Sequence, residues 1–217
     1  DVKEVYEGDD GIFAHAQHNA VLIDFTTSSP ALAKTLAAVA KERGFAMLDA
    51  PVSGGDSGAR DATLSIMAGG DADVFKRMLP VFSLLGKGIH YMGPAGSGQH
   101  TKACNQIAVA GAVAAMSEAL VYARAVGLDE KKMLAAISGG AAGSWQITNT
   151  APRVLNQDFA PGFYIKHFIK DMHIVQQEME EQGVHLDMLE AVCNMYEALA
   201  NAKEENNGTQ ALVHYYE

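Results

Sequence analysis

Cysteine is scarce in this 217-residue chain, which contains only Cys104 and Cys193, far apart and without a C-x-x-C pair. This excludes a disulfide framework and the common cysteine-based zinc sites. Because both cysteines fall in apolar helical patterns, we expect two buried, reduced thiols and a cytoplasmic, reducing compartment. The eight histidines have no carboxylates at a metal-ligand spacing, so we expect no metal site.

Positive charge and long apolar runs are also scarce. The chain has 16 Lys and Arg against 26 Asp and Glu, a formal net charge of -10, and no basic cluster, which argues against a nucleic-acid partner. The polar start, Asp1–Glu4, does not resemble a signal peptide. The longest apolar run, Ile107–Met116, is too short to cross a bilayer, so we expect no membrane association.

The composition that remains is that of an ordinary globular protein, 48% hydrophobic and 19% charged. Short apolar runs alternate with amphipathic helical patterns up to about residue 93, which favours a parallel α/β sheet. The predicted strands are 20–24, 46–50, 64–70 and 89–92, and the predicted helices between them are 30–43 and 72–85.

After the last of these strands every pattern is helical. One helix is predicted from Gly98 to about Val126, and it is apolar nearly all round, which is typical of a buried central helix. Asp129 is expected to cap the next helix. Further helices are predicted at 131–138, 145–155, 168–182 and 186–202. The expected fold is α/β followed by all-α, with domains at 1–93 and 94–217.

The first segment with candidate chemistry is the loop Asp49–Thr63, which follows a predicted strand and holds Ser53, Gly54 and Gly55. Ligands of open α/β sheets bind beyond the carboxyl ends of strands, and glycines allow the backbone to approach a carboxylate closely. The alternative is a tight turn in which glycine only supplies a positive φ.

The second segment is the glycine-rich loop Gly93–Gly98, which leads into the long helix. Its outer glycines have P-loop spacing, but the Lys and Ser/Thr that must follow the second glycine are missing. Lys102 lies in an early turn, with Asn105 and Gln106 on the same face. It is a candidate general acid and base, and the alternative is a solvated lysine near a helix end.

Two further segments are weaker alone. Asp24–Pro30, with Thr27, joins a strand to a helix, where its hydroxyl side chains contact a ligand or cap the helix. Lys170 and Asp171 begin an amphipathic helix, where the alternative to a functional role is a surface ion pair.

Taken in order, the four segments resemble the β-hydroxyacid dehydrogenases of the 3-hydroxyisobutyrate dehydrogenase type. The motifs are Asp-x-Thr-Thr-x-x-Pro, Asp-x-Pro-Val-Ser-Gly-Gly-x-x-Gly-Ala, Gly-x-Gly-x-x-x-Lys-x-x-Asn and Lys-Asp, and the resemblance covers nearly the whole chain. It implies the C-terminal part of a Rossmann-like dinucleotide-binding domain, followed by a helical domain joined to it by the long central helix. It also implies hydride transfer between NAD or NADP and a short 3-hydroxy acid or its semialdehyde, of the 3-hydroxyisobutyrate or 2-hydroxy-3-oxopropionate type.

The resemblance assigns roles to individual residues. Lys102 is implied to be the catalytic residue. The residues implied to hold the substrate are Ser53, Gly54, Gly55, Asn105 and Gln106. Those implied to lie near the cofactor are Thr27, Lys170 and Asp171. A buried long helix within a helical domain also leads us to expect a homodimer or homotetramer.

One departure concerns the glycine motif G-x-G-x-x-G of the first βα turn, which family members carry and which is absent here. By that comparison two βα units, about 60–70 residues at about 30 each, are missing, and NAD cannot be separated from NADP. We expect an N-terminally incomplete dehydrogenase that is inactive as it stands. The alternatives are a non-catalytic helical dimerisation module that binds a small carboxylate, a related imine reductase, and a relative of 6-phosphogluconate dehydrogenase.

Overall fold

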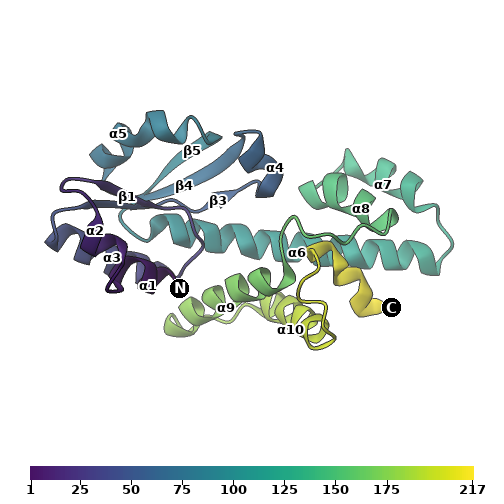
Figure 1. Ribbon diagram of the computed structural model, residues 1–217. Helices are drawn as coiled ribbons and strands as arrows, with labels where there is room; N and C mark the ends of the chain where they lie inside the picture. Colours follow the sequence, from purple (N-terminus) through teal and green to yellow (C-terminus); the bar gives the residue numbers. More distant parts are fainter. The chain divides into compact units, whose positions relative to one another are not determined.

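The computed structural model describes residues 1–217 and divides into two compact units, an α/β unit, Asp1–Asn105, and a helical unit, Gln106–Glu217 (Figure 1). The long helix α6 (Ser97–Ala125) contributes its first residues to the α/β unit and the rest to the helical unit. An α/β part followed by an all-helical part is the predicted order. The boundary after residue 93 stays a prediction.

The α/β unit is built on a five-stranded sheet. Its elements before α6 are α1 (Val2–Glu7), α2 (Ile12–His15), β1 (Val21–Asp24), α3 (Pro30–Glu42), β2 (Ala46–Asp49), β3 (Val52–Ser53), α4 (Gly55–Arg60), β4 (Leu64–Gly70), α5 (Ala72–Phe82) and β5 (Gly86–Gly93). The predicted strands and helices are all present, whereas β3 and α4 lie in a segment that was expected to be loop.

The sheet is mixed rather than parallel. β1 and β2 are parallel, as are β4 and β5, but β4 runs antiparallel to both β2 and β3. The prediction of a parallel sheet is therefore wrong for these two pairs. The chain passes from β2 to β4 through β3 and α4, without a crossover helix, and a strand that returns in this way runs antiparallel.

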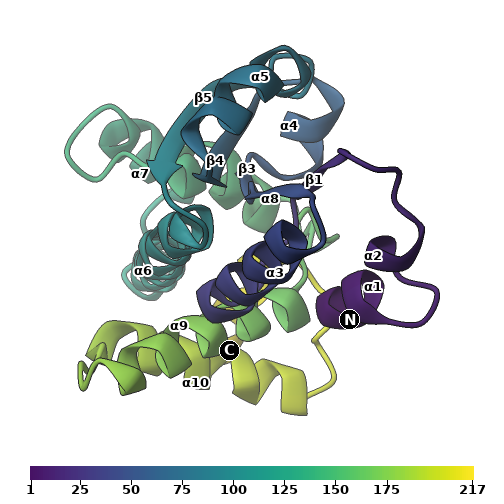
Figure 2. The same cartoon turned by 90° about the vertical axis from the view of Figure 1, so that its left-hand side faces the viewer.

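The sheet separates two hydrophobic clusters, because successive strand residues point to opposite faces. Met47 of β2 packs in one cluster with Leu36 of α3, and the next residue, Leu48, packs in the other with Phe75 and Phe82 of α5. Figure 2 shows α3 and α5 on either side of the strands. The two clusters therefore hold the carboxyl end of β2, where the predicted substrate loop begins.

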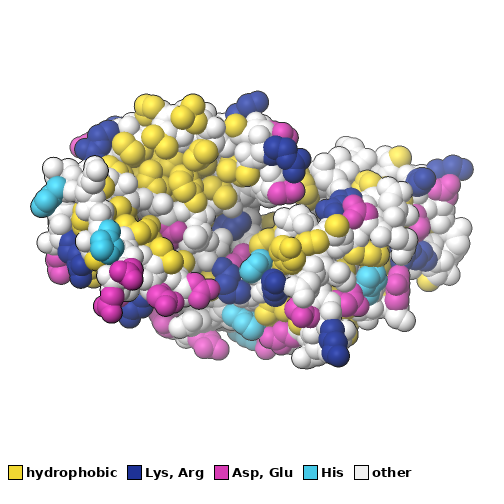
Figure 3. Space-filling model, viewed as in Figure 1, with side chains coloured by type: hydrophobic (Ala, Val, Ile, Leu, Met, Phe, Trp, Pro, Cys, Tyr) yellow, Lys and Arg dark blue, Asp and Glu magenta, His cyan; other side chains and the backbone are white.

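Hydrophobic side chains also gather on the surface of the α/β unit, over α5 and the strands beside it (Figure 3). Leu79 and Val81 of α5 are exposed, and Leu84 just after it is 75% exposed. An apolar surface of this kind is typical of a region that another segment or protein covers.

Helix caps follow the sequence patterns. The Ser29 hydroxyl accepts the N–H of Leu32 at the start of α3, and Asp71 caps α5 in the same way. The predicted cap at Asp129 is confirmed, since its carboxylate accepts the N–H of Lys132 at 3.0 Å.

The helical unit contains no β-strand, as predicted. After α6 it consists of α7 (Glu130–Ser138), a π-helix (Gln146–Thr150), α8 (Ala151–Leu155), α9 (Ile165–Glu181), α10 (Asp187–Asn201) and a 3-10 helix (Thr209–Tyr216). The last of these was not predicted, because a short 3-10 segment has no apolar periodicity of its own.

The long helix α6 is fully buried along one face, and most of its other residues are half-buried, so the expectation of a buried central helix holds for one face only. Its buried residues recur every three or four positions, as at Lys102, Gln106 and Ala110. Cys104 lies between them and is exposed, so the prediction of two buried thiols holds only for Cys193.

By length and composition, α6 is apolar enough to cross a membrane, although its longest uninterrupted apolar run is short. In the fold, 39% of its most apolar stretch is buried. The core helix of a soluble protein passes the same test, which makes this weak evidence for a membrane span.

Candidate active site

The predicted substrate loop follows the carboxyl end of β2. β2 ends at Asp49, and the chain passes through β3 to Gly54 and Gly55, which have φ values of 130° and 65°. The φ of Gly54 is open to glycine and strained for other residues, and the φ of Gly55 lies in the left-handed region that glycine adopts most easily. Ser53 is half-buried, and the two glycines are exposed. Their N–H groups are therefore accessible to a small anion.

Lys102 lies beside this loop. It projects from α6, is only 9% exposed, and donates a hydrogen bond from Nζ to the carbonyl oxygen of Val52 at 2.8 Å. Val52 directly precedes Ser53. The α/β unit thus brings together the predicted catalytic lysine and the predicted substrate loop, which are about fifty residues apart in the chain.

Asp49 was not predicted as a site residue, although it anchors the start of α6. Its carboxylate, 3% exposed, accepts the backbone N–H groups of Gly96 at 2.8 Å and Gln99 at 3.0 Å. Burial raises the pKa of the Asp49 carboxyl, and the hydrogen bonds from Gly96 and Gln99 oppose that rise. A Cβ on Gly98 would collide with the Asp49 carbonyl oxygen, so this helix start needs glycine.

The predicted cofactor loop, Thr26–Ser28, follows β1. Asp24 Oδ1 accepts the backbone N–H of Thr26 at 2.9 Å and its hydroxyl at 2.7 Å. The buried Gln99 amide donates from Nε2 to the Thr26 carbonyl oxygen at 2.8 Å and accepts the Ser28 N–H at Oε1 at 3.1 Å. These bonds bracket Thr27, the residue predicted to contact the cofactor.

In the helical unit, a second group of predicted residues comes together. Gln106 of α6 donates from Nε2 to Asp171 Oδ2 of α9 at 2.7 Å, and both side chains are buried. Lys170 Nζ lies 2.9 Å from Asp171 Oδ1, as an ion pair whose lysine is 47% exposed and whose carboxylate is 2% exposed. The alternative interpretation of Lys170 and Asp171 was a surface ion pair. It does not describe Asp171, because this carboxylate is buried.

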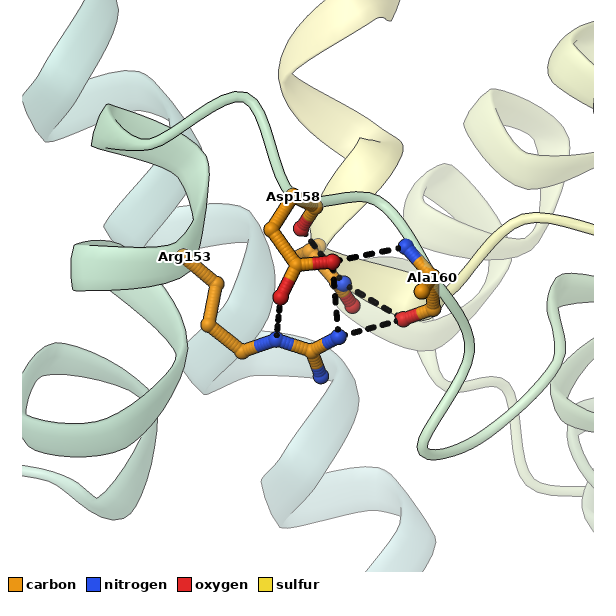
Figure 4. A network of polar contacts seen from close by, with 4 residues as sticks. Arg153, Asp158 and Ala160 are labelled. Atoms are coloured by element: carbon orange, nitrogen blue, oxygen red, sulfur yellow. Dashed lines mark hydrogen bonds and ion pairs between the residues drawn. The ribbon is translucent and has the colours of Figure 1, made fainter.

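The connection from α8 to α9, the helix of Lys170 and Asp171, is held by a polar network (Figure 4). Arg153 Nε and Nη2 contact the two carboxylate oxygens of Asp158 at 2.9 and 3.2 Å, and Nη2 also donates to the Ala160 carbonyl oxygen at 2.6 Å. Gln210 Nε2 donates to the carbonyl oxygens of Asp158 and Ala160, both at 3.0 Å. The Arg153 guanidinium lowers the pKa of Asp158, which keeps the carboxylate charged.

One group of side chains has metal-ligand chemistry, namely His173 of α9 with Cys193 and Glu197 of α10. His173 Nε2 and Glu197 Oε1 form a half-exposed pair at 2.8 Å. Burial, and then the negative charge of Glu197, raises the pKa of the Cys193 thiol to about 11. The absence of a metal site stays a prediction.

The predicted site residues fall into two groups. Thr27, Ser53–Gly55, Lys102 and Asn105 belong to the α/β unit, and Gln106, Lys170 and Asp171 belong to the helical unit. Sequence reasoning missed Asp49 and Gln99. The signal for Asp49 was an acidic residue inside an apolar strand, and that for Gln99 was an amide one turn before Lys102.

Two family models match nearly the whole chain. Residues 1–93 match the NAD-binding domain of 6-phosphogluconate dehydrogenase, and residues 96–216 match the NAD-binding model of NADP-dependent 3-hydroxyisobutyrate dehydrogenase.

Known proteins of similar sequence are oxidoreductases. An uncharacterized oxidoreductase of Bacillus subtilis (strain 168) is 52% identical over 212 residues, which cover 98% of this chain and 74% of that protein. The 2-hydroxy-3-oxopropionate reductase of Escherichia coli (strain K12) is 39% identical over 209 residues, which cover 96% of this chain and 70% of that protein.

Solved structures agree in fold. A Mycobacterium tuberculosis 3-hydroxyisobutyrate dehydrogenase with L-serine has a TM-score of 0.85 at 31% identity, over 94% of this chain and 72% of that one. An imine reductase of Myxococcus stipitatus with NADP+ has a TM-score of 0.58 at 17% identity, over 100% of this chain and 76% of that one. This likeness shows the fold alone.

Proposed function

This chain belongs to the β-hydroxyacid dehydrogenase family, whose members are NAD(P)-dependent, and we propose that its substrate is a short 3-hydroxy acid or the corresponding semialdehyde. The substrate would be of the 3-hydroxyisobutyrate or 2-hydroxy-3-oxopropionate type, a hydroxyl or aldehyde carbon two bonds from a carboxylate. The cofactor is NAD or NADP.

The observation that carries this proposal is the 2.8 Å hydrogen bond from Lys102 Nζ to the Val52 carbonyl oxygen. Lys102 is only 9% exposed, and this hydrogen bond holds its Nζ atom next to Ser53 in the predicted substrate loop. A proton donor and acceptor must lie within hydrogen-bond reach of the reacting oxygen, and a fixed lysine beside a substrate loop meets that requirement.

The loop suits the carboxylate end of such a substrate. Gly54 and Gly55 have no side chain that would block their N–H groups, and Ser53 adds a hydroxyl. Because the chain has a net charge of -10, a small anion needs a local positive site, and the backbone N–H groups of this loop would supply it. Asn105 and Gln106 follow Lys102 on α6 and would orient the substrate, as the family resemblance implies.

The reaction divides between cofactor and protein. The bound nicotinamide supplies hydride acceptance or donation at the carbon that bears the oxygen. In oxidation, the neutral amine of Lys102 accepts the hydroxyl proton while the C–H bond breaks and a C=O bond forms. In reduction, the ammonium of Lys102 returns that proton to the carbonyl oxygen. Ser53, Gly54 and Gln106 raise the rate by holding the substrate in one geometry.

The residues of this chain fit a dinucleotide. The cofactor loop Thr26–Ser28 lies at the carboxyl end of β1 and at the start of α3, where open α/β sheets bind such ligands. The buried Ser28 hydroxyl has no hydrogen-bond partner within the protein, which leaves a polar group for a ligand to satisfy. The family resemblance implies a cofactor role for Thr27 of this loop and, in the helical unit, for Lys170 and Asp171.

The test is a coenzyme-oxidation assay on the full-length gene product that contains these residues. NADH and NADPH are offered with methylmalonate semialdehyde, tartronate semialdehyde or succinate semialdehyde, for wild type, Lys102→Ala and Lys132→Ala. Lys132 serves as the control because its side chain is 87% exposed and lies on α7.

We expect turnover with one of the first two aldehydes, retained in Lys132→Ala and lost in Lys102→Ala. Turnover that persists without Lys102 would contradict the assignment. A folded protein with no turnover and no affinity for either coenzyme would favour the small-carboxylate binding module instead.

A further inference from the structure

Gln99 joins two parts of the α/β unit that the sequence keeps far apart. Its side-chain amide accepts the Ser28 N–H at 3.1 Å and donates to the Thr26 carbonyl oxygen at 2.8 Å, across separations of 71 and 73 residues. Gln99 is 2% exposed. A single planar amide therefore clamps both sides of Thr27, in a site from which water is excluded.

The backbone of Gln99 is held as firmly as its side chain. Its N–H donates to the buried carboxylate of Asp49 at 3.0 Å, and the same carboxylate accepts the N–H of Gly96. Hydrogen bonds to a charged group are among the stronger ones in proteins. The first turn of α6 is thus locked onto the end of β2, and the Gln99 side chain starts from a fixed point.

Lys102 lies three residues after Gln99 on α6, so the two side chains share a helix face and are offset by about 4.5 Å along the helix axis. Lys102 Nζ in turn contacts Val52. Because an α-helix is rigid over one turn, the distance between the cofactor loop and the lysine head group is set through Gln99.

We propose that Gln99 is a positioning residue that holds the Thr26–Ser28 loop against the first turn of α6, in the conformation that binds the coenzyme. This inference rests on the proposed function and deepens it, since Gln99 touches neither reacting atom and acts through the loop. Its amide is specifically suited to the task, because one side must accept a hydrogen bond and the other must donate one.

The experiment compares Gln99→Leu with Gln99→Glu in the full-length protein. The leucine variant loses both hydrogen bonds at similar volume. The glutamate variant keeps an acceptor for the Ser28 N–H and replaces the donor to the Thr26 carbonyl with a carboxylate oxygen. The matched control is Gln210→Leu, a glutamine of the same 2% exposure whose Nε2 bonds two carbonyl oxygens within the helical unit.

Three quantities are measured for each variant: the Kd of NADH and NADPH by fluorescence titration, the steady-state constants, and the amide hydrogen exchange of the peptide that contains Ser28. We expect Gln99→Leu to raise the coenzyme Kd and KM about tenfold, with kcat at saturating coenzyme changed by less than about twofold. Exchange at Ser28 should accelerate. Gln99→Glu, which sets a buried carboxylate oxygen against the Thr26 carbonyl oxygen, should raise the coenzyme Kd at least as much as Gln99→Leu.

The control separates positioning from general stability. Gln210→Leu should lower the unfolding midpoint as much as Gln99→Leu, yet leave the coenzyme Kd and the exchange at Ser28 unchanged. A merely structural role for Gln99 would reduce the active fraction, and therefore kcat, without raising the coenzyme Kd.

Two failures remain distinguishable. If wild type binds coenzyme and Gln99→Leu binds it equally well, the positioning role is wrong and the dehydrogenase function stands. If turnover is independent of Lys102 while Gln99→Leu still weakens coenzyme binding, the proposed chemistry is wrong and the positioning role stands. A wild-type protein that binds neither coenzyme overturns both.

Discussion

The carboxylate of Asp49, at the last residue of β2, accepts a hydrogen bond of 3.0 Å from the backbone N–H of Gln99, in the first turn of α6. The same strand end continues directly into the substrate loop. One buried carboxylate therefore aligns the start of α6, the helix of Lys102, with the segment that is proposed to bind the substrate. The predictions below test this alignment and the chemistry that depends on it.

The first prediction concerns pH and Asp49. Burial raises the pKa of its carboxyl in the folded protein, so the folded state binds the proton more tightly than the unfolded state. The resulting stability is fully present below the ordinary pKa of about 3.9 and is lost as the pH rises through the raised value. Asp49→Asn has no carboxyl to titrate at this position and therefore lacks this loss of stability. Urea titrations measure the free energy of unfolding of both proteins at several pH values. The value for wild type minus the value for the variant should fall as the pH rises from the ordinary pKa through the raised pKa of Asp49.

Asp71, which caps α5, is the matched control with the opposite sign. Hydrogen bonds from the Val74 and Asp73 N–H groups lower its pKa. The Asp71 carboxylate therefore contributes to the free energy of unfolding above its ordinary pKa, and this contribution is lost as the pH falls through the lowered pKa. Asp71→Asn should therefore remove a pH dependence that lies below about pH 3.9. If the difference in free energy of unfolding between wild type and variant changed with pH in the same way for Asp49→Asn and Asp71→Asn, the raised pKa of Asp49 would be contradicted.

The second prediction tests how Lys102 acts. Lys102→Arg keeps the positive charge but places there a guanidinium, which cannot be deprotonated in a protein. If Lys102 moves the proton, the arginine variant should lose at least about a hundredfold in kcat while its circular dichroism and coenzyme Kd stay close to those of wild type. An active arginine variant would show that charge alone is sufficient.

The third prediction concerns the buried pair in the helical unit. Asp171→Ala leaves the Gln106 amide without its acceptor and should lower the free energy of unfolding by about 1–3 kcal/mol. Asp171→Asn retains an acceptor oxygen and should cost less. Chemical denaturation measures the free energy of unfolding of wild type and the two variants. An asparagine variant less stable than the alanine variant would contradict the prediction.

The fourth prediction separates the two cysteines. Cys193 is buried, and its thiol pKa is raised to about 11, whereas Cys104 is exposed. Since the thiolate is the reactive form, iodoacetamide at about pH 8 should alkylate Cys104 first and Cys193 only after urea is added. Peptide mass spectrometry reads both sites. Rapid modification of Cys193 in the native protein would contradict its burial between α9 and α10.

The sequence by itself determined the order of elements and most of the candidate site. Apolar periodicity and caps such as Asp129 are local properties, so the longer helices of both units are where the patterns predict them, whereas the short α4 and the C-terminal 3-10 helix were missed. The motifs around Ser53 and Lys102 were sufficient to indicate the family, because a family resemblance depends on residue types at fixed spacings.

Only the tertiary structure decided which of these residues meet. The antiparallel return of β4, the burial of Asp171 and the two-sided clamp of Gln99 on the cofactor loop cannot be found from local patterns. The Asp49–Gln99 contact spans 50 residues, and an acidic residue in an apolar strand predicts a buried partner without identifying it. The physical reason is that periodicity records which face of an element is buried, whereas hydrogen-bond partners depend on how separate elements pack together.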